Sequence, residues 1–206
     1  MEHDMQLLEA NGHRYLFVMA VEAEYGRELS RRFNPLFTGV GPVEAASTTS
    51  AALAALAASE RSPDFVVSLG SAGSHKLTQT DIYQVSTVAY RDMDASGIGF
   101  AKGLTPFLDI PAELPLLAPL SHVPAKRLST GANIVSGAAY ASIDADMVDM
   151  ETFAIARCCM RHNVPLIGLR GISDGAAELN HINDWTQYLH IIDEKLARVV
   201  DDLLSA

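Results

Sequence analysis

The chain has few cysteines and no long apolar run. Only two cysteines, Cys158 and Cys159, occur in 206 residues, and adjacent cysteines cannot cross-link distant segments. We therefore expect reduced thiols in a cytoplasmic protein. No apolar run approaches the roughly 20 residues that cross a bilayer. The acidic start, with Glu2 and Asp4, is unlike a secretory signal.

Basic residues are also scarce. Fifteen Lys and Arg stand against 25 Asp and Glu, which gives a net charge of −10. Such a surface repels DNA, RNA and anionic lipid, so we expect neither a nucleic acid nor a membrane as partner. The seven histidines are scattered without the spacing of metal ligands, so no metal site is expected. Small neutral or cationic ligands remain open.

What the chain does contain is a large apolar fraction, 49% of its residues, and a regular alternation of segment types. Short apolar runs typical of buried strands alternate with stretches of helical spacing. This order predicts an α/β fold in one domain, residues 1–206 with a core from about 15 to 204, in which helices flank a mixed, mainly parallel sheet. The expected strands are 15–21, 36–40, 64–69, 82–90, 126–130 and 164–172. The expected helices are 22–32, 43–59, 151–162 and 184–204, and 101–124 should be mostly loop with a short helical turn.

Acidic residues cluster at three places where these elements end or begin. Glu22 and Glu24 follow the first strand, Glu151 starts a helix, and Asp174 follows the last strand. Each alone is explained as a charge at a helix terminus or a turn residue. Because an α/β sheet builds its pocket at the strand ends, the three together predict a pocket lined by carboxylates. The glycine-rich segments 39–41 and 70–73 would let a ligand approach backbone amides closely.

Five segments resemble the purine nucleoside phosphorylase/nucleosidase superfamily in their order and style. They are TGVGPVEAA (38–46), SLGSAGS (68–74), STGANIV (129–135), VDMETFAIA (148–156) and RGISDGA (170–176). Within the superfamily, they look most like the family of 5'-methylthioadenosine/S-adenosylhomocysteine nucleosidases. The resemblance implies a nucleoside phosphorylase-like fold, a nucleoside substrate, no cofactor, and a homodimer in which the partner closes each pocket.

The resemblance also implies roles for individual residues. Glu24 would activate the attacking water, and Asp174 would protonate the purine at N7. Met150 would pack against the ribose, and Glu151 would hold its hydroxyls. The other implied substrate-binding residues are Ser71, Ala72 and Gly73 beside the sugar, Asn133 and Ile134 beside the base, and Arg170 and Ser173 as supporting groups.

The chemistry of these side chains agrees with that implication. Breaking an N-glycosidic bond makes the sugar cationic and the departing purine anionic. Carboxylates at Glu24 and Glu151 would stabilise the sugar. A buried, protonated Asp174 would make the base a better leaving group. Acidic residues after the first strand would also repel phosphate, which favours hydrolysis over phosphorolysis.

Several alternatives remain open from the sequence. One is a phosphorylase, another is a nucleosidase for 5'-deoxyadenosine or a futalosine-like nucleoside, and a third is a non-catalytic nucleoside-binding protein. Asn133 stands where the family commonly places an aromatic side chain over the purine, so base stacking is weaker or comes from another residue. Trp185, Tyr188 and Leu189 either cap the 5' substituent or, as we expect, pack in the core.

Overall fold

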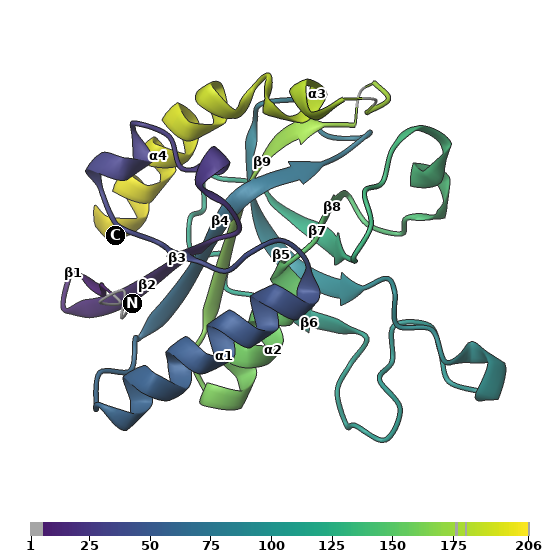
Figure 1. The fold of residues 1–206 in the computed structure, drawn as a ribbon, viewed down its shortest axis with the longest axis horizontal. Helices are drawn as coiled ribbons and strands as arrows, with labels where there is room; N and C mark the ends of the chain where they lie inside the picture. Colours follow the sequence, from purple (N-terminus) through teal and green to yellow (C-terminus); the bar gives the residue numbers. More distant parts are fainter. Residues whose placement is uncertain (1–5, 176, 180, 206) are drawn as a thin grey trace.

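A computed structural model describes residues 6–175, 177–179 and 181–205, and its strands and helices alternate along the chain (Figure 1). The strands are β1 (Leu8–Ala10), β2 (His13–Met19), β3 (Leu36–Phe37), β4 (Phe65–Gly73), β5 (Ile82–Tyr90), β6 (Glu113–Pro115), β7 (Ala125–Thr130), β8 (Met147–Asp149) and β9 (Leu166–Asp174). The α-helices are α1 (Pro42–Ala58), α2 (Thr152–His162), α3 (Ile182–Thr186) and α4 (Leu189–Ser205). Four 3-10 turns are η1 (Glu22–Glu24), η2 (Leu29–Arg31), η3 (Ser96–Ile98) and η4 (Gly137–Ser142).

The sheet closes on itself to form a barrel. β4 pairs with β9, β9 with β5, β5 with β7, β7 with β8, and β8 returns to β4. The β9–β5 and β8–β4 pairings are antiparallel, and the other three are parallel. A mixed sheet flanked by helices is therefore confirmed, whereas "mainly parallel" does not describe this closed barrel. The three-residue strand β8, which closes it, lies within an acidic segment that has no strand pattern of its own.

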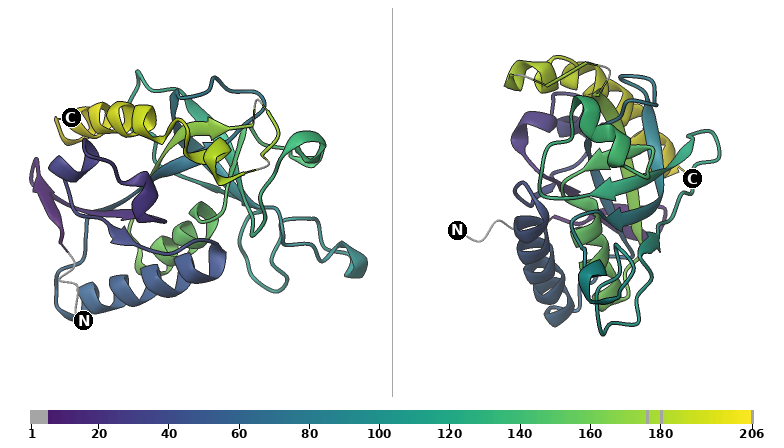
Figure 2. Two further views of the ribbon diagram at one scale, coloured as in Figure 1. Left: turned by 45° about the horizontal axis from the view of Figure 1, so that its top comes forward. Right: turned by 90° about the vertical axis from the view of Figure 1, so that its right-hand side faces the viewer.

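Two hydrophobic layers cover opposite faces of the strands. Successive side chains of a strand point to opposite faces, and in β2 Leu16 and Val18 pack with α1 and α2, whereas Phe17 and Met19 pack with α4. Figure 2 shows the two groups of helices on either side of the sheet. The strand expected at 15–21 is thus confirmed as the buried strand β2, and its apolar side chains are buried on both faces.

The segment 22–32 is not the helix that its spacing suggests but the two short turns η1 and η2. The buried carboxylate of Asp193, on α4, accepts hydrogen bonds from the backbone amides of Glu28 and Leu29 at 2.8 and 3.0 Å. Gly26 lies against the same carboxylate, where a Cβ atom would collide with it. This tertiary contact holds the chain out of helical conformation and fixes the turn that carries Glu24.

Other boundaries also differ from the predictions. β4 continues through the glycine-rich segment 70–73 because it pairs with β9 along its whole length. The expected C-terminal helix is divided into α3 and α4. No helical turn occurs in 101–124, which contains β6, and the nearby turn η3 comes earlier. The helices expected at 43–59 and 151–162 are confirmed as α1 and α2 to within a residue at each end. In the described ranges, no helix is long and apolar enough to cross a membrane.

Candidate active site

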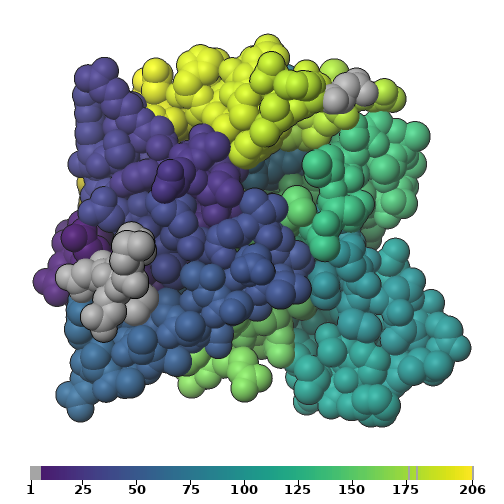
Figure 3. Space-filling view, in the orientation of Figure 1, coloured from purple at the N-terminus to yellow at the C-terminus, as the bar shows by residue number. Residues whose placement is uncertain are grey.

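A cavity of about 670 Å³ opens at the ends of β4, β8 and β9. In the space-filling view the surface is hollowed below the yellow C-terminal segment, between the purple segment near residue 25 and the green segments beyond residue 130 (Figure 3). The lining residues are Ala20, Val21, Ala23, Glu24, Val40, Ser71, Ala72, Gly73, Arg91, Asn133, Ile134, Val148, Asp149, Met150, Glu151, Asp174, Leu179, His181, Ile182 and Trp185.

Glu24 projects from η1 onto β4. Its Oε1 atom accepts hydrogen bonds from the backbone amide of Ser71 at 2.7 Å and from the Ser71 hydroxyl at 2.6 Å. Burial raises the pKa of this carboxyl, while the two bonds from Ser71 and the positive charge of Arg170 lower it. Oε1 is thus held by two donors, and Oε2 is the carboxylate oxygen left to act in the cavity.

Glu151 lies immediately before α2 and is held from the other side. Its Oε1 accepts a hydrogen bond from the backbone amide of Gly41 at 2.8 Å. Gly41 has φ +93°, a conformation that favours glycine, and this geometry turns its N–H toward Glu151. Burial and the neighbouring Asp149 raise the pKa of Glu151 to about 7, against the opposing effects of Gly41 and Arg170.

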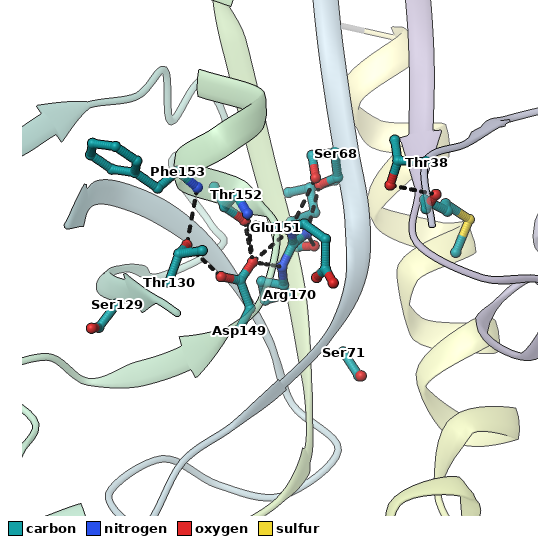
Figure 4. Close-up of polar contacts among 12 residues, drawn as sticks. Thr38, Ser68, Ser71, Ser129, Thr130, Asp149, Glu151, Thr152, Phe153 and Arg170 are labelled. Atoms are coloured by element: carbon teal, nitrogen blue, oxygen red, sulfur yellow. Dashed lines mark hydrogen bonds and ion pairs between the residues drawn. The ribbon is translucent and has the colours of Figure 1, made fainter. Parts of the chain in front are cut away.

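A buried ion pair between Asp149 and Arg170 lies near Glu151 (Figure 4), and both of its charges act on Glu24 and Glu151. Asp149 accepts from Arg170 at 3.1 Å through Oδ2 and from Thr130 at 2.6 Å through Oδ1. It also accepts from the backbone amide and hydroxyl of Thr152, which satisfies the first turn of α2. The other Arg170 partners are the hydroxyls of Ser68 and Thr152 and the carbonyls of Ser68 and Leu169. Every N–H of this guanidinium is therefore engaged inside the protein.

Asp174, the last residue of β9, has a different environment. It is 9% exposed, and its Oδ1 accepts from the Ser173 hydroxyl at 2.5 Å. Burial raises its pKa, and the Ser173 hydrogen bond opposes this only in part. A Cβ atom at Gly73 would lie 2.8 Å from Asp174 Oδ2, so glycine is needed there to leave room for the carboxyl. The site thus favours a protonated acid at Asp174.

Arg91 lies at the same end of the cavity, close to Asn133. Its guanidinium donates to the backbone carbonyls of Ser129 and Asn133, each at 2.6 Å, and to that of Asp149 at 3.0 Å. Burial lowers the pKa of Arg91. Ile134, next to Asn133, is 70% exposed, so this rim of the cavity is open in the single chain.

Comparison with known proteins assigns the chain to a family. The sequence pattern of the phosphorylase superfamily matches residues 36–205. The 5'-methylthioadenosine/S-adenosylhomocysteine nucleosidase of Staphylococcus aureus (strain MRSA252) is 30% identical, over 69% of this chain and 70% of its own length. The chain belongs to the phosphorylase superfamily, among its nucleosidases.

Solved structures of the superfamily share the fold of this member. The methylthioadenosine/S-adenosylhomocysteine nucleosidase of Colwellia psychrerythraea 34H, in complex with adenine, superposes with a TM-score of 0.79 at 22% identity, covering 96% of this chain and 97% of its own. A futalosine hydrolase mutant of Helicobacter pylori strain 26695 gives 0.78 at 18% identity, covering 93% and 98%. At these identities the likeness establishes the fold.

Most residues singled out in the sequence of this superfamily member meet in the cavity. They are Glu24, Ser71, Ala72, Gly73, Asn133, Ile134, Met150, Glu151 and Asp174. Arg170 and Ser173 do not line it, because both side chains are buried behind the wall, where they bond to Asp149 and Asp174. They position other residues and have no contact with the cavity. Among the described residues, no group of three His, Cys, Asp or Glu side chains is arranged to hold a metal ion.

Several cavity residues of this superfamily member, Arg91 and Trp185 among them, were not assigned to the cavity from the sequence. Arg91 directly follows the fourth predicted strand, and this position at a strand end was the one feature of the sequence that could have indicated a cavity residue. Trp185 packs against the core on the α4 side, as expected, and it also lines the cavity; Leu189 is buried in the same core. The division between α3 and α4, which the helical spacing did not indicate, separates these two side chains.

Proposed function

We propose that this protein hydrolyses the N-glycosidic bond of 5'-thio-substituted adenosines of the methylthioadenosine/S-adenosylhomocysteine type, releasing adenine and a 5-thio-substituted ribose. The observation that carries the proposal is that Glu24 and Asp174 lie against the same strand, β4, in one cavity. Glu24 bonds to Ser71, and Asp174 lies beside Gly73. Two residues of a strand span about 7 Å, a distance suited to the two ends of a ribosyl–purine bond.

The proposed reaction divides proton transfer between these two acids. Glu24 Oε2 takes a proton from water as the water oxygen attacks C1' of the sugar. The electrons of the C–N bond leave with the purine, and Asp174 donates its proton to N7. The raised pKa of Asp174 keeps that proton available near neutral pH. Glu151 and Met150, which line the same cavity as Glu24, hold the ribose and stabilise its developing positive charge.

Hydrolysis fits the sugar end of the cavity better than phosphorolysis does. A phosphorylase needs free cationic or amide donors for its anionic nucleophile. Arg170 is the cation whose charge acts on the Glu24 carboxyl, and all its N–H groups are engaged. The partly buried carboxyl groups of Glu24 and Glu151 would repel phosphate.

The test is to incubate purified protein with methylthioadenosine in phosphate-free buffer and to follow adenine and free reducing sugar. We expect adenine release at a rate that added phosphate does not increase. Formation of a sugar 1-phosphate, with no turnover when phosphate is left out, would establish a phosphorylase. Unchanged methylthioadenosine and methylthioinosine after prolonged incubation, together with measurable binding of either, would argue for a nucleoside-binding protein without catalysis.

Apolar side chains support a thioether at the 5' position. Val21, Val40, Ile182 and Trp185 form an apolar part of the cavity lining, and Trp185 bonds to Ser71, the partner of Glu24. Val40 is 51% and Ile182 64% exposed, so this part opens to solvent and leaves space for substituents larger than methyl. Rates with 5'-deoxyadenosine, methylthioadenosine and S-adenosylhomocysteine should show that the sulfur-containing substituents are preferred.

A second candidate substrate carries a 6-oxopurine, as in a futalosine-like nucleoside. The observation that favours it is Arg91, whose guanidinium lies beside Asn133 at the base end and can donate a hydrogen bond to a carbonyl oxygen. Methylthioadenosine and methylthioinosine differ only in this part of the base, so their kcat/KM ratio decides between the candidates. In Arg91→Met the rate with methylthioinosine should fall more than the rate with methylthioadenosine if Arg91 reads the oxygen.

We also infer a homodimer. The segment between β5 and β6 extends away from the barrel, as Figures 1 and 2 show, and exposes Ile98 by 73% and Phe107 by 91%. The cavity rim is apolar and open at Ile134 and Ile182. A second copy that covers both surfaces would bury them and close the site. Light scattering should give the mass of two chains, and Phe107→Ser should lower that mass and raise KM.

A further inference from the structure

Trp185 is the single tryptophan of the chain and lines the cavity. Its side chain bonds to Ser71, which also bonds to Glu24. Its indole Nε1–H donates a hydrogen bond to the Ser71 hydroxyl at 2.9 Å. That hydroxyl lies 2.6 Å from Glu24 Oε1. Trp185, Ser71 and Glu24 therefore form a chain of hydrogen bonds that begins on α3 and ends at the carboxyl proposed to activate water.

The direction of each bond in this chain is fixed by chemistry. An indole N–H is a donor only, so Ser71 Oγ must accept from Trp185. An ionised carboxylate is an acceptor only, so the Ser71 hydroxyl must donate its one proton to Glu24. Without the indole, the hydroxyl would be free to rotate and to bond to water or substrate instead.

This arrangement also decides which oxygen of Glu24 receives a proton. Oε1 already faces two donors, the backbone amide and the hydroxyl of Ser71. A proton on Oε1 would face the hydrogen atoms of both donors and disrupt their bonds to this oxygen, so an incoming proton goes to Oε2. As long as the Ser71 hydroxyl keeps its direction, the basic atom of Glu24 is the one that remains available to the cavity.

We propose that Trp185 is a positioning residue which, through Ser71, commits Glu24 Oε2 to take the proton of the attacking water. The inference rests on the proposed hydrolysis. Water loses one proton to Oε2 while its oxygen bonds to C1', the C–N electrons leave with the purine, and Asp174 supplies the proton to N7. Afterwards Glu24 returns its proton to solvent and Asp174 regains one, so atoms and charges balance.

Loss of the indole donor should also change the pH dependence. The charged groups around Glu24 are Arg170 of β9, Asp149 of β8 and Glu151, and Asp174 and His181 line the same cavity. These groups stay in place in Trp185→Phe, so the change at Glu24 comes from its hydrogen bond with Ser71. When that hydroxyl turns away, a contribution that lowers the Glu24 pKa is weakened, and the pKa rises.

The first experiment is Trp185→Phe, which keeps an aromatic ring and removes the donor. We expect kcat to fall about 3- to 10-fold, as for the loss of one hydrogen bond, with little change in KM. The acidic limb of the kcat profile should move to higher pH. Tyr188→Phe is the control, because Tyr188 follows α3 and does not line the cavity; its activity should equal that of the unchanged protein.

The second experiment asks whether Trp185 acts through Ser71. In a Ser71→Ala background, Trp185→Phe should cause no further loss of kcat, because the chain is already broken. Equal losses in both backgrounds, or a change confined to KM, would show that Trp185 only packs against substrate. If the unchanged protein releases no adenine, the proposed hydrolysis fails; an active protein with an unaffected Trp185→Phe variant contradicts this inference alone.

A third measurement uses the protein without change to Trp185. A single tryptophan gives one indole N–H signal in a ¹H–¹⁵N spectrum. Its chemical shift should follow the titration of Glu24 and lose that dependence in Glu24→Gln and in Ser71→Ala. A shift that titrates identically in all three proteins would overturn the proposal, whether or not Trp185→Phe folds.

Discussion

The two ends of the cavity hold their acids in opposite ways. At the sugar end, Glu24 and Glu151 accept hydrogen bonds from backbone amides, and the charge of Arg170 favours their charged forms. At the base end, Asp174 has burial and the hydroxyl of Ser173 alone acting on its pKa. Burial raises the pKa at both ends, so the difference teaches that amide and guanidinium groups oppose protonation of Glu24 and Glu151, whereas at Asp174 the Ser173 hydroxyl opposes it alone.

Asp174→Asn tests the base end and should give the largest effect. An amide keeps the size of the side chain but cannot supply the proton, so kcat for adenine release should fall by about 10²–10⁴-fold. Adenine binding, measured by calorimetry, should change little. Ser173→Ala is the matched control at the neighbouring residue and should lose far less activity. Near-full activity of Asp174→Asn would refute the assigned role.

Glu24→Gln tests the sugar end and should be second in size. Turnover should fall by roughly 10²-fold, with a smaller change in KM, because activation of water acts in the transition state. Glu22→Gln is the control, since Glu22 lies in the same turn but is exposed and does not line the cavity. Comparable turnover with weaker binding would mean that Glu24 only positions substrate.

Arg170→Met removes the cation that distinguishes the two ends. Loss of one partner leaves Asp149 buried and unpaired, which should lower the free energy of unfolding by about 3–5 kcal/mol. Urea unfolding measures this loss. Arg127→Met removes an ion pair of partly exposed side chains with Glu113 and should cost at most about 1 kcal/mol. Similar losses for the two variants would contradict the structural role assigned to Arg170.

Glu151→Gln should give the smallest effect, in the pH dependence of stability. The folded state raises the Glu151 pKa to about 7 from its ordinary value of 4.5. Between these values the folded chain binds more protons than the unfolded one, so Glu151 makes the free energy of unfolding fall as pH rises. Removing it should flatten that fall between pH 5 and 8 by about 2 kcal/mol. Parallel curves for variant and unchanged protein would show that Glu151 is charged throughout.

The sequence was informative wherever a feature is local. The alanine-rich run predicted α1, and the continuous apolar run after Val164 predicted β9, because such patterns act within one element. Motif resemblance likewise identified Glu24, Glu151 and Asp174, which line one cavity.

Features that depend on distant contacts were not predictable in this way. The strand β8 exists because β7 and β4 pair with it, and η1 and η2 replace a helix because Asp193 binds their backbone from α4. Arg170 carries the motif resemblance of a substrate-binding residue, yet its partners bury it behind the wall. Sequence spacing contains no information on which face of the barrel such a side chain enters.

The barrel closes between β4 and β8 at one residue pair, Gly73 and Val148, whereas its other pairings are longer. This short seam lies directly in the cavity wall, since both residues line it. A ligand that touches Gly73 on one strand and Met150 beyond the other would bridge the seam. Occupancy of the site should therefore slow hydrogen exchange of amides along β8, because bound substrate would hold β4 and β8 together.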